Sequence, residues 1–566
     1  MCSLQGQNHS QHKIVAQYRS LLRRTTKMEN RIWKAFGILA GGVLFILTVN
    51  ASYAAPPTPQ RGGILKISAR GEAPTLNSMM NPSVAVMPYM APVFNGLVMI
   101  DPTQGEVGVE KVVPALAEKW TVSSDGRIYT FFLRKGIRFH DGQPFTAKDA
   151  KYSLDFFADP AKSALASLVG MMDKVEVVDN YTIKVFLKYP HLPFLFYLSY
   201  PYCVMLPAHL AKVNSKSPDF LIGTGPFKFK SRIPGKVWIY ERNPEYFLKG
   251  LPYLEGVEIY NMDWEPALNA FIAGRLDMPG NLRFAINSGL TLDKIKKHVP
   301  EAIIKLKPAG SIRGVWFNVA GLKGRKGPWQ DVRVRRAMAL ATDFPGSIIA
   351  AQGSLELGIA SGVVPPNVPT GLPGEEAGKT LGIDKPMEQR IEKAKRLMKE
   401  AGYLHGFKGE IISRNQTHYW KSTEFMIESW RKNLNIQVEM KVLENAILFP
   451  RRDTGDFDMI YEGTPGMYGG APEETLAYFM SNSIANYGKW SHQEYDKFYE
   501  KLMQEPDPRK RKEISVKMQK IFLEEVPSII NYTAITGTAH RPTLHGFVIG
   551  PGHTNWACMD RIWLGK

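Results

Sequence analysis

The sequence predicts an α/β fold. Runs of β-branched residues typical of strands alternate with amphipathic segments typical of helices, and no internal repeat or low-complexity linker interrupts them. The chain has 566 residues, of which 44% are hydrophobic and 22% are charged. This composition excludes a disordered, collagen-like or polytopic membrane protein, and the length predicts two or three globular units.

The first 54 residues are predicted to be an export signal that is removed. Arg31 and Lys34 precede an uncharged apolar run at 35–49, and small residues at Ser52 and Ala54 suit a signal peptidase. The run is shorter than the ~20 residues that cross a bilayer. We therefore expect cleavage near Ala54 and a soluble protein in the periplasm; an uncleaved N-terminal anchor is the alternative.

The first elements of the mature chain are strands and one capped helix. Residues 63–68 predict a first strand, and Thr146 with Asp149 predicts a helix start, because hydroxyl and acidic groups suit the first turn. The β-branched runs at 174–178 and 181–187 flank the turn signal Asp179-Asn180, so they predict a hairpin.

Three helices are predicted in the second half of the chain. Asp331 precedes an amphipathic helix at 332–341, a second helix at 390–401 stops at Gly402, and Ser422 caps a helix that runs to Leu434.

Two strands follow these helices. The alternating run at 436–442 predicts a half-buried strand, and the apolar run at 457–461 predicts a buried one.

No catalytic, metal or nucleotide motif emerges. His140-Asp141 resembles a fragment of a catalytic dyad, but it precedes Gly142 in a turn, where Asp141 is expected to accept backbone amides. Gly378-Lys379-Thr380 is not a phosphate loop, because Pro373 stands where the motif needs glycine. No enzyme activity, cofactor or metal is therefore expected.

The charge and cysteine content point to neither nucleic acid nor a disulfide framework. The net charge is +18, but seven basic residues lie in the first 54 residues and the other basic runs lack interleaved aromatics. Cys203 and Cys558 remain after cleavage, and the sequence leaves open whether they pair.

An ordered series of motifs resembles one family. The motifs are RGGILK at 61–66, PALAEKW at 114–120, LRKGIRFHDGQPFTAKD at 133–149, GTGPF at 223–227, ERNP at 241–244 and DVRVR at 331–335. Their order is similar to that of extracytoplasmic solute-binding protein family 5, the oligopeptide- and dipeptide-binding proteins of ABC importers. The resemblance covers residues 61 to 560.

The resemblance implies a type II periplasmic-binding-protein fold with two lobes joined by a hinge. Lobe I would be discontinuous, with an additional domain on its side, and the three domains would divide as follows: lobe I at 55–99, 222–308 and 541–566, the additional domain at 100–221, and lobe II at 309–540.

The implied function is capture of a peptide or other small polar solute between the lobes and its delivery to an ABC permease in the cytoplasmic membrane. A ligand that binds the closed state better shifts the population towards closure. We expect a monomer without nucleic-acid partners.

The ligand-binding segment departs from the family pattern. Peptide binders of the family carry an Asp four residues before a Pro, which pairs with the peptide amino group, but this sequence has Tyr468 there. Gly466 and Met467 precede it, and Glu462 is the nearby acid that supplies a charge if the ligand is a peptide. Amine capture is therefore in doubt, and a sugar, opine or other polar metabolite is an alternative ligand.

Six further residues are candidate pocket residues because they lie at strand ends and loops. They are Glu72, Thr75, Trp316, Asn318, Arg414 and Asn415.

An exported enzyme or peptide-handling chaperone on the same scaffold is the rival to solute capture. His140-Asp141 and the aromatic content of 11% motivate it.

Overall fold

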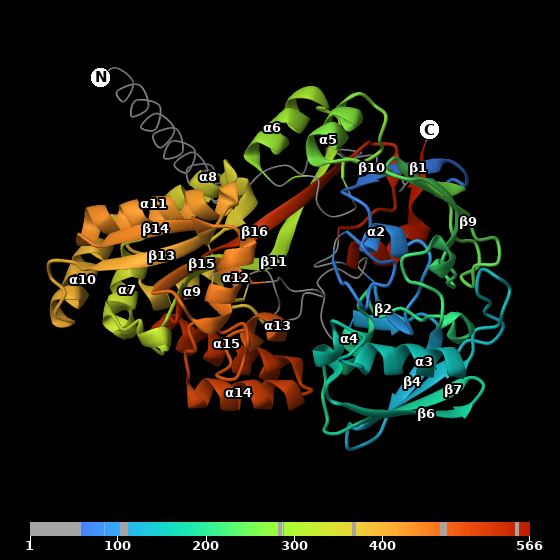
Figure 1. The fold of residues 1–566 in the computed structure, drawn as a ribbon, viewed down its shortest axis with the longest axis horizontal. Coiled ribbons are helices and arrows are strands. Elements are labelled where there is room, and N and C mark those ends of the chain that lie inside the picture. Colours follow the sequence, from blue (N-terminus) through green and yellow to red (C-terminus); the bar gives the residue numbers. More distant parts are fainter. Residues whose placement is uncertain are drawn as a thin grey trace, which may run out of the picture. The chain divides into compact units, whose positions relative to one another are not determined.

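The computed structural model describes residues 58–565 except 84, 102–110, 281–285, 287, 361, 365–369, 465–471 and 550–553. The predicted export signal and the segment with Tyr468 lie outside the described residues, whereas the RGGILK motif at 61–66 lies within them. The predicted α/β class is confirmed, since helices and sheets alternate along the chain and build two lobes (Figure 1).

The first lobe is built on a four-stranded sheet in the order β1-β10-β9-β8, in which β1 and β10 are parallel. The strands are β1 (Ile64–Ala69), β8 (Phe227–Ile233), β9 (Val237–Arg242) and β10 (Gly256–Asn261). The helices of this part are α2 (Met87–Met90), α5 (Trp264–Ile272) and α6 (Gly289–His298). The predicted first strand is confirmed.

A second, antiparallel sheet in the order β4-β5-β7-β6 follows the first segment of this lobe. Its elements are β4 (Ala117–Val122), β5 (Ile128–Leu133), α3 (Ala147–Ala158), β6 (Met172–Asp179), β7 (Thr182–Leu187) and α4 (Phe194–Leu198). The predicted hairpin is confirmed, because β6 pairs with β7 across the turn. Asp149 accepts hydrogen bonds from the amide and hydroxyl of Thr146, so the predicted helix start is also confirmed.

These two sheets share one hydrophobic core. Leu65 and Ile67 of β1, Phe131 of β5 and Ile562 near the C-terminus all belong to the same buried cluster. Two short ladders complete this part: β2 (Val98–Ile100) with β3 (Val112–Pro114), and β17 (Leu544–His545) with β18 (Trp563–Leu564). The domain boundaries predicted from the sequence stay a prediction.

The second lobe is built on a six-stranded mixed sheet in the order β12-β16-β11-β15-β13-β14. Its strands are β11 (Ile303–Phe317), β12 (Gly358–Ile359), β13 (Lys408–Arg414), β14 (Gln437–Leu443), β15 (Met459–Gly463) and β16 (Ser528–His540). Both predicted strands of this lobe exist, although the buried one begins at Met459 rather than at 457.

Helices cover both faces of this sheet. They are α7 (Val332–Leu340), α8 (Phe344–Gln352), α9 (Gly374–Leu381), α10 (Met387–Glu400), α11 (Thr417–Leu434), α12 (Asn445–Thr454), α13 (Pro472–Ala477), α14 (Gln493–Gln504) and α15 (Pro508–Glu525). Successive side chains of a strand point to opposite faces. Val315 and Phe317 accordingly join the core under α7, α10 and α11, whereas Trp316 joins the core under α12 to α15.

The longest strands, β11 and β16, link the six-stranded sheet with helices of the first lobe. Ile304 of β11 and Ala539 of β16 pack in a cluster with Phe271 of α5 and Ile295 of α6. The other end of β11 pairs with β15 inside the second lobe. The same two strands therefore contribute to the cores of both lobes.

The helix ends test three sequence predictions. Asp331 accepts a hydrogen bond from the amide of Arg333 at the start of α7, and Gly402 lies just after α10 with a φ of +85°, so both predicted termini are confirmed. The prediction that Ser422 caps α11 is wrong. The helix begins at Thr417, and Ser422 is buried inside it, where its hydroxyl accepts hydrogen bonds from Tyr461 and Asn531.

Cys203 and Cys558 are both buried and unpaired. Among the described helices, none combines the length and the apolar character needed to cross a bilayer.

Candidate functional site

Charged side chains gather where three strands of the second lobe end side by side. β13 and β15 are parallel and finish at Arg414 and Gly463, while the antiparallel β11 passes Arg313 opposite Gly463. The carboxyl ends of parallel strands are where α/β proteins commonly bind ligands. We call Arg313, Arg414, Arg452, Asp453 and Glu462 the carboxyl-end cluster.

Glu462 is the centre of this cluster and is fully buried. Arg414 holds it with two contacts, from Nε to Oε2 at 3.0 Å and from Nη2 to Oε1 at 2.8 Å. The amide of Gly463 also donates to Oε1 at 2.7 Å, and Nη1 of Arg452 lies 3.5 Å from Oε2. This two-pronged geometry is the strong form of the arginine–carboxylate pair.

Aromatic rings flank the guanidinium groups. The guanidinium of Arg414 lies 4.8 Å from the ring centre of Phe449 and 5.1 Å from that of Tyr419, and Arg452 lies 4.6 Å from Phe449 and 4.8 Å from Tyr487. Such cation–π contacts fix the planes of the guanidinium groups. Burial raises the pKa of Tyr487 to about 12, so its hydroxyl stays neutral.

The positive charge of the cluster affects a neighbouring histidine. Burial, with the positive charges of Arg313 and Arg414, lowers the pKa of His418 to about 4. His418 is therefore neutral near pH 7 and can offer one hydrogen-bond donor and one acceptor.

The arrangement suits recognition rather than bond chemistry. Rigid guanidinium forks and aromatic faces are the groups that orient a small organic ligand in a pocket.

The structure brings Arg414 and Glu462 together, two residues that the sequence predicted separately. Asn415 follows at the end of β13, is exposed, and donates to Glu444 at 2.6 Å. Their roles in ligand binding stay predictions.

The other predicted site residues lie elsewhere. Trp316 is 1% exposed and stacks on Phe479 in the core, and Asn318 donates to the carbonyl groups of Gly455 and Phe457. These side chains support the second lobe, so the structure gives them a packing role whatever their part in binding.

Glu72 and Thr75 lie in the first lobe. Glu72 is exposed and accepts from the amide of Gly235, and Thr75 is buried and bonds Ser215 at 2.9 Å. Gly466, Met467 and Tyr468 lie outside the described residues. No ligand role of these five residues is tested by the fold.

Sequence reasoning missed Arg313, Arg452, Tyr419 and Phe449. Arg313 precedes Gly314 inside a strand, and Arg452 belongs to the charged run Arg451-Arg452-Asp453. The one sequence signal available was the position of Arg313 beside Gly314 in a strand. The places of Arg452, Tyr419 and Phe449 in the site depend on tertiary contacts.

His140 and Asp141 do not form a dyad with each other. Nε2 of His140 lies 3.0 Å from the carbonyl oxygen of Gly225, and burial lowers its pKa to about 4. Asp141 accepts from the amide of Gln143, as predicted for a turn, and lies 2.7 Å from His209.

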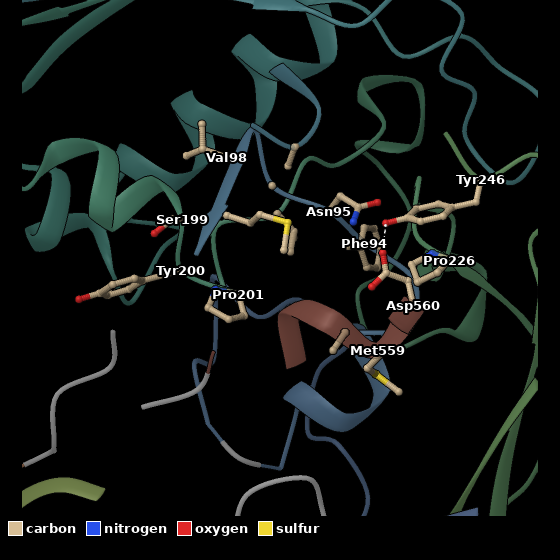
Figure 2. Close-up of a pocket in the computed structure, with 15 residues that line it drawn as sticks. Phe94, Asn95, Val98, Ser199, Tyr200, Pro201, Pro226, Tyr246, Met559 and Asp560 are labelled. Carbon is tan, nitrogen blue, oxygen red and sulfur yellow. Dashed lines mark hydrogen bonds between the residues drawn. The ribbon is translucent and has the colours of Figure 1, made fainter. Parts of the chain in front are cut away.

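A separate small cavity lies in the first lobe (Figure 2). Its volume is about 50 Å³, and Asp560 and Tyr246 line it with a hydrogen bond of 3.3 Å between them. Burial raises the pKa of Asp560 to about 6. This volume holds a few water molecules but is far below the ~300 Å³ that an organic solute needs.

Comparison with known proteins decides the family. The model for the middle region of the bacterial extracellular solute-binding proteins, family 5, matches residues 111–487. The chain belongs to this family. The family resemblance that the sequence predicted is thereby confirmed.

Relatives of this solute-binding protein cover most of its length. The probable deoxycholate-binding periplasmic protein YgiS of Escherichia coli is 26% identical over 92% of this chain and 96% of its own length. The glutathione-binding protein GsiB of Escherichia coli is 27% identical over 79% of this chain and 86% of its own.

A solved structure shares the fold. HbpA2 from Haemophilus parasuis superposes with a TM-score of 0.76 at 22% identity, covering 89% of this chain and 100% of that one. The predicted role is confirmed at the level of the family: this is an extracytoplasmic solute-binding protein that serves an ABC importer.

Proposed function

We propose that this solute-binding protein captures a peptide or another small polar solute between its two lobes and delivers it to the membrane permease. The carboxyl-end cluster carries the proposal. It places guanidinium groups and aromatic rings at strand ends, where a ligand can be gripped through hydrogen bonds and ring faces.

The buried carboxylate bears on which solute is captured. Glu462 is the predicted partner for a peptide amine, but it is fully buried and held by Arg414 and the amide of Gly463. An amine would have to replace contacts that are already made. This supports a solute recognised without its amino group, as a non-peptide metabolite would be.

Isothermal titration of the mature protein tests capture. Deoxycholate and glutathione, which the names of the two relatives suggest, are the first solutes, followed by short peptides. We expect saturable 1:1 binding to one of them. Absence of binding throughout the series would contradict the proposed solute class.

Tyr468, with Gly466 and Met467, remains the proposed ligand contact beyond β15. Tyr468→Ala should weaken the affinity for the bound solute about tenfold, because an aromatic anchor and one hydroxyl are lost. Unchanged affinity would remove this segment from the proposed site.

Export and assembly complete the proposal. Residues 1–54 direct the chain to the periplasm and are removed, so Edman sequencing of periplasmic material should begin at Ala55. The mature protein is a monomer without nucleic-acid partners, and light scattering should give a single-chain mass with and without solute.

Capture without chemistry is the remaining part of the proposal. The proteins of this family bind substrates, and Nε2 of His140 contacts the carbonyl oxygen of Gly225 rather than a nucleophile. The bound solute should be recovered intact. Product formation that is lost in His140→Ala would favour the rival enzyme.

A further inference from the structure

Arg313 forms no ion pair within the described part of the chain. Nη1 donates to Oγ of Ser311 and lies 3.4 Å from the carbonyl oxygen of Ile312. Nε is buried and has no hydrogen-bond partner, and no carboxylate of the described residues forms an ion pair with this side chain. A guanidinium has five N–H donors, and the buried Nε–H of Arg313 is one that is unused.

Glu462, the acid whose charge acts on Arg313, is already paired with other donors. Its two oxygens are held by Arg414, by the amide of Gly463 and, at longer range, by Arg452. Arg452 has its own partner in Asp453 at 2.7 Å. Three guanidinium groups of the carboxyl-end cluster therefore face two carboxylates, which leaves one positive charge in excess.

The fold makes room for this arginine. A Cβ at Gly463 would overlap the guanidinium of Arg313, so only glycine permits its position beside β15. The guanidinium also lies 5.1 Å from the ring centre of Tyr419. The side chain is thus held in one place, where the charge of Glu462 acts on it without an ion pair between the two.

A largely buried charge without a direct ion pair costs free energy of folding. Burying an ion without a partner is unfavourable, and an incoming anion removes that penalty. The neutral state of the neighbouring His418 agrees with a locally positive environment.

We propose that Arg313 binds the carboxylate group of the captured solute. The inference rests on the proposed function and adds the substrate class. The solute carries one carboxylate, and this carboxylate is on the end of the solute that contacts the second lobe. The planar fork of a guanidinium matches a planar carboxylate, and a single excess charge matches a single negative charge better than the doubly charged form of a phosphate.

Paired probes that differ only in this group test the proposal. The pairs are deoxycholate with its methyl ester, and trialanine with trialanine amide, titrated calorimetrically into wild type, Arg313→Gln, Arg313→Lys and Arg431→Gln. Arg431 is the matched control, because it is exposed on α11 and pairs with Glu428 away from the cluster.

Wild type and Arg431→Gln should bind the acid of a pair about tenfold to a hundredfold more tightly than its neutral partner, as a charge-assisted hydrogen bond provides. Arg313→Gln should bind both members equally, and Arg313→Lys should keep part of the preference. Circular dichroism and thermal midpoints verify that each variant is folded. If Arg313→Gln does not fold, Arg313→Lys still tests the proposal.

The outcomes separate two failures. If wild type binds a neutral member as tightly as its acid, or if Arg313→Gln keeps the preference, the role of Arg313 is wrong while solute capture stands. If wild type binds no member of either pair, capture of this solute class fails and the inference fails with it.

Discussion

Two ionic clusters lie at opposite ends of β13, and their charge balance differs. The amino-end cluster consists of Arg325, Lys441, Arg451, Glu410, Asp456 and Asp458, three cations with three carboxylates joined by six ion pairs. The carboxyl-end cluster has three guanidinium groups and two carboxylates. The balanced cluster needs no ligand, whereas the unbalanced one is complete only when an anion arrives.

The central carboxylates of the two clusters also differ in burial. Glu462 of the carboxyl-end cluster is 0% exposed and Glu410 of the amino-end cluster is 13% exposed, while the outer carboxylates Asp453 and Asp456 are 57% and 40% exposed. Exposed ion pairs contribute little to stability because water screens them, whereas a buried charge is costly once its partner is removed. The number of ion pairs, six in the amino-end cluster and three in the carboxyl-end cluster, therefore does not decide how much each cluster contributes to stability.

The largest predicted effect is loss of the central carboxylate of the carboxyl-end cluster. Glu462→Gln should lower the free energy of unfolding by about 3–5 kcal/mol, because Glu462 is fully buried and the guanidinium of Arg414, which is 18% exposed, loses its charge partner. Urea denaturation measures the loss.

Glu410→Gln is the matched variant in the amino-end cluster. It should cost only about 1–2 kcal/mol, since Glu410 is 13% exposed and Asp456 and Asp458 remain to pair with Arg325 and Arg451. Equal losses in the two variants would mean that burial does not distinguish the clusters.

The second effect is that the two clusters at the ends of β13 change the free energy of unfolding over different pH ranges. The pKa of His418 is about 4 in the folded chain against an ordinary value of 6.5, so between these values the unfolded chain binds more protons. The contribution of His418 to stability should be full above pH 6.5 and fall by about 3 kcal/mol as the pH drops towards 4.

His418→Gln should flatten this part of the stability profile, whereas His405→Gln, at an exposed position, should leave it unchanged. The amino-end cluster responds only at lower pH, because the hydrogen bond from Arg325 lowers the pKa of Asp456 below 3.8. An unaltered slope in His418→Gln between pH 6.5 and 4 would show that the imidazole is not held neutral.

The smallest effect is predicted at the exposed rim of the amino-end cluster. Lys441→Gln removes one ion pair to Glu410, but Arg451 still binds the same carboxylate at 2.7 Å. The urea midpoint should therefore be indistinguishable from that of wild type. A measurable decrease in the urea midpoint of Lys441→Gln would mean that the amino-end cluster contributes more to the stability of the second lobe than the exposure of Lys441 suggests.

Local sequence signals predicted local structure. The cap at Asp331 and the hairpin of β6 and β7 depend on residues a few positions apart, and both were predictable. Ser422 was misassigned because its hydroxyl is satisfied by Tyr461 and Asn531, which are distant in the sequence.

The site was only partly predictable for the same reason. Arg414 and Glu462 were identified as strand-end residues, but their ion pair joins positions 48 residues apart. Arg313 comes from a third strand, and a strand pattern does not reveal which charged residues meet or which of them lack a partner. The excess charge of the cluster is a property of the assembled lobe.

The buried state of Cys203 and Cys558 has a practical consequence. Burial raises the pKa of both thiols, to about 12 for Cys558, so neither reacts readily with a maleimide at neutral pH. Dyes attached to two cysteines introduced on the surface, one in each lobe, would then report energy transfer without background labelling of these native thiols. The approach of the lobes around a solute becomes visible in single molecules.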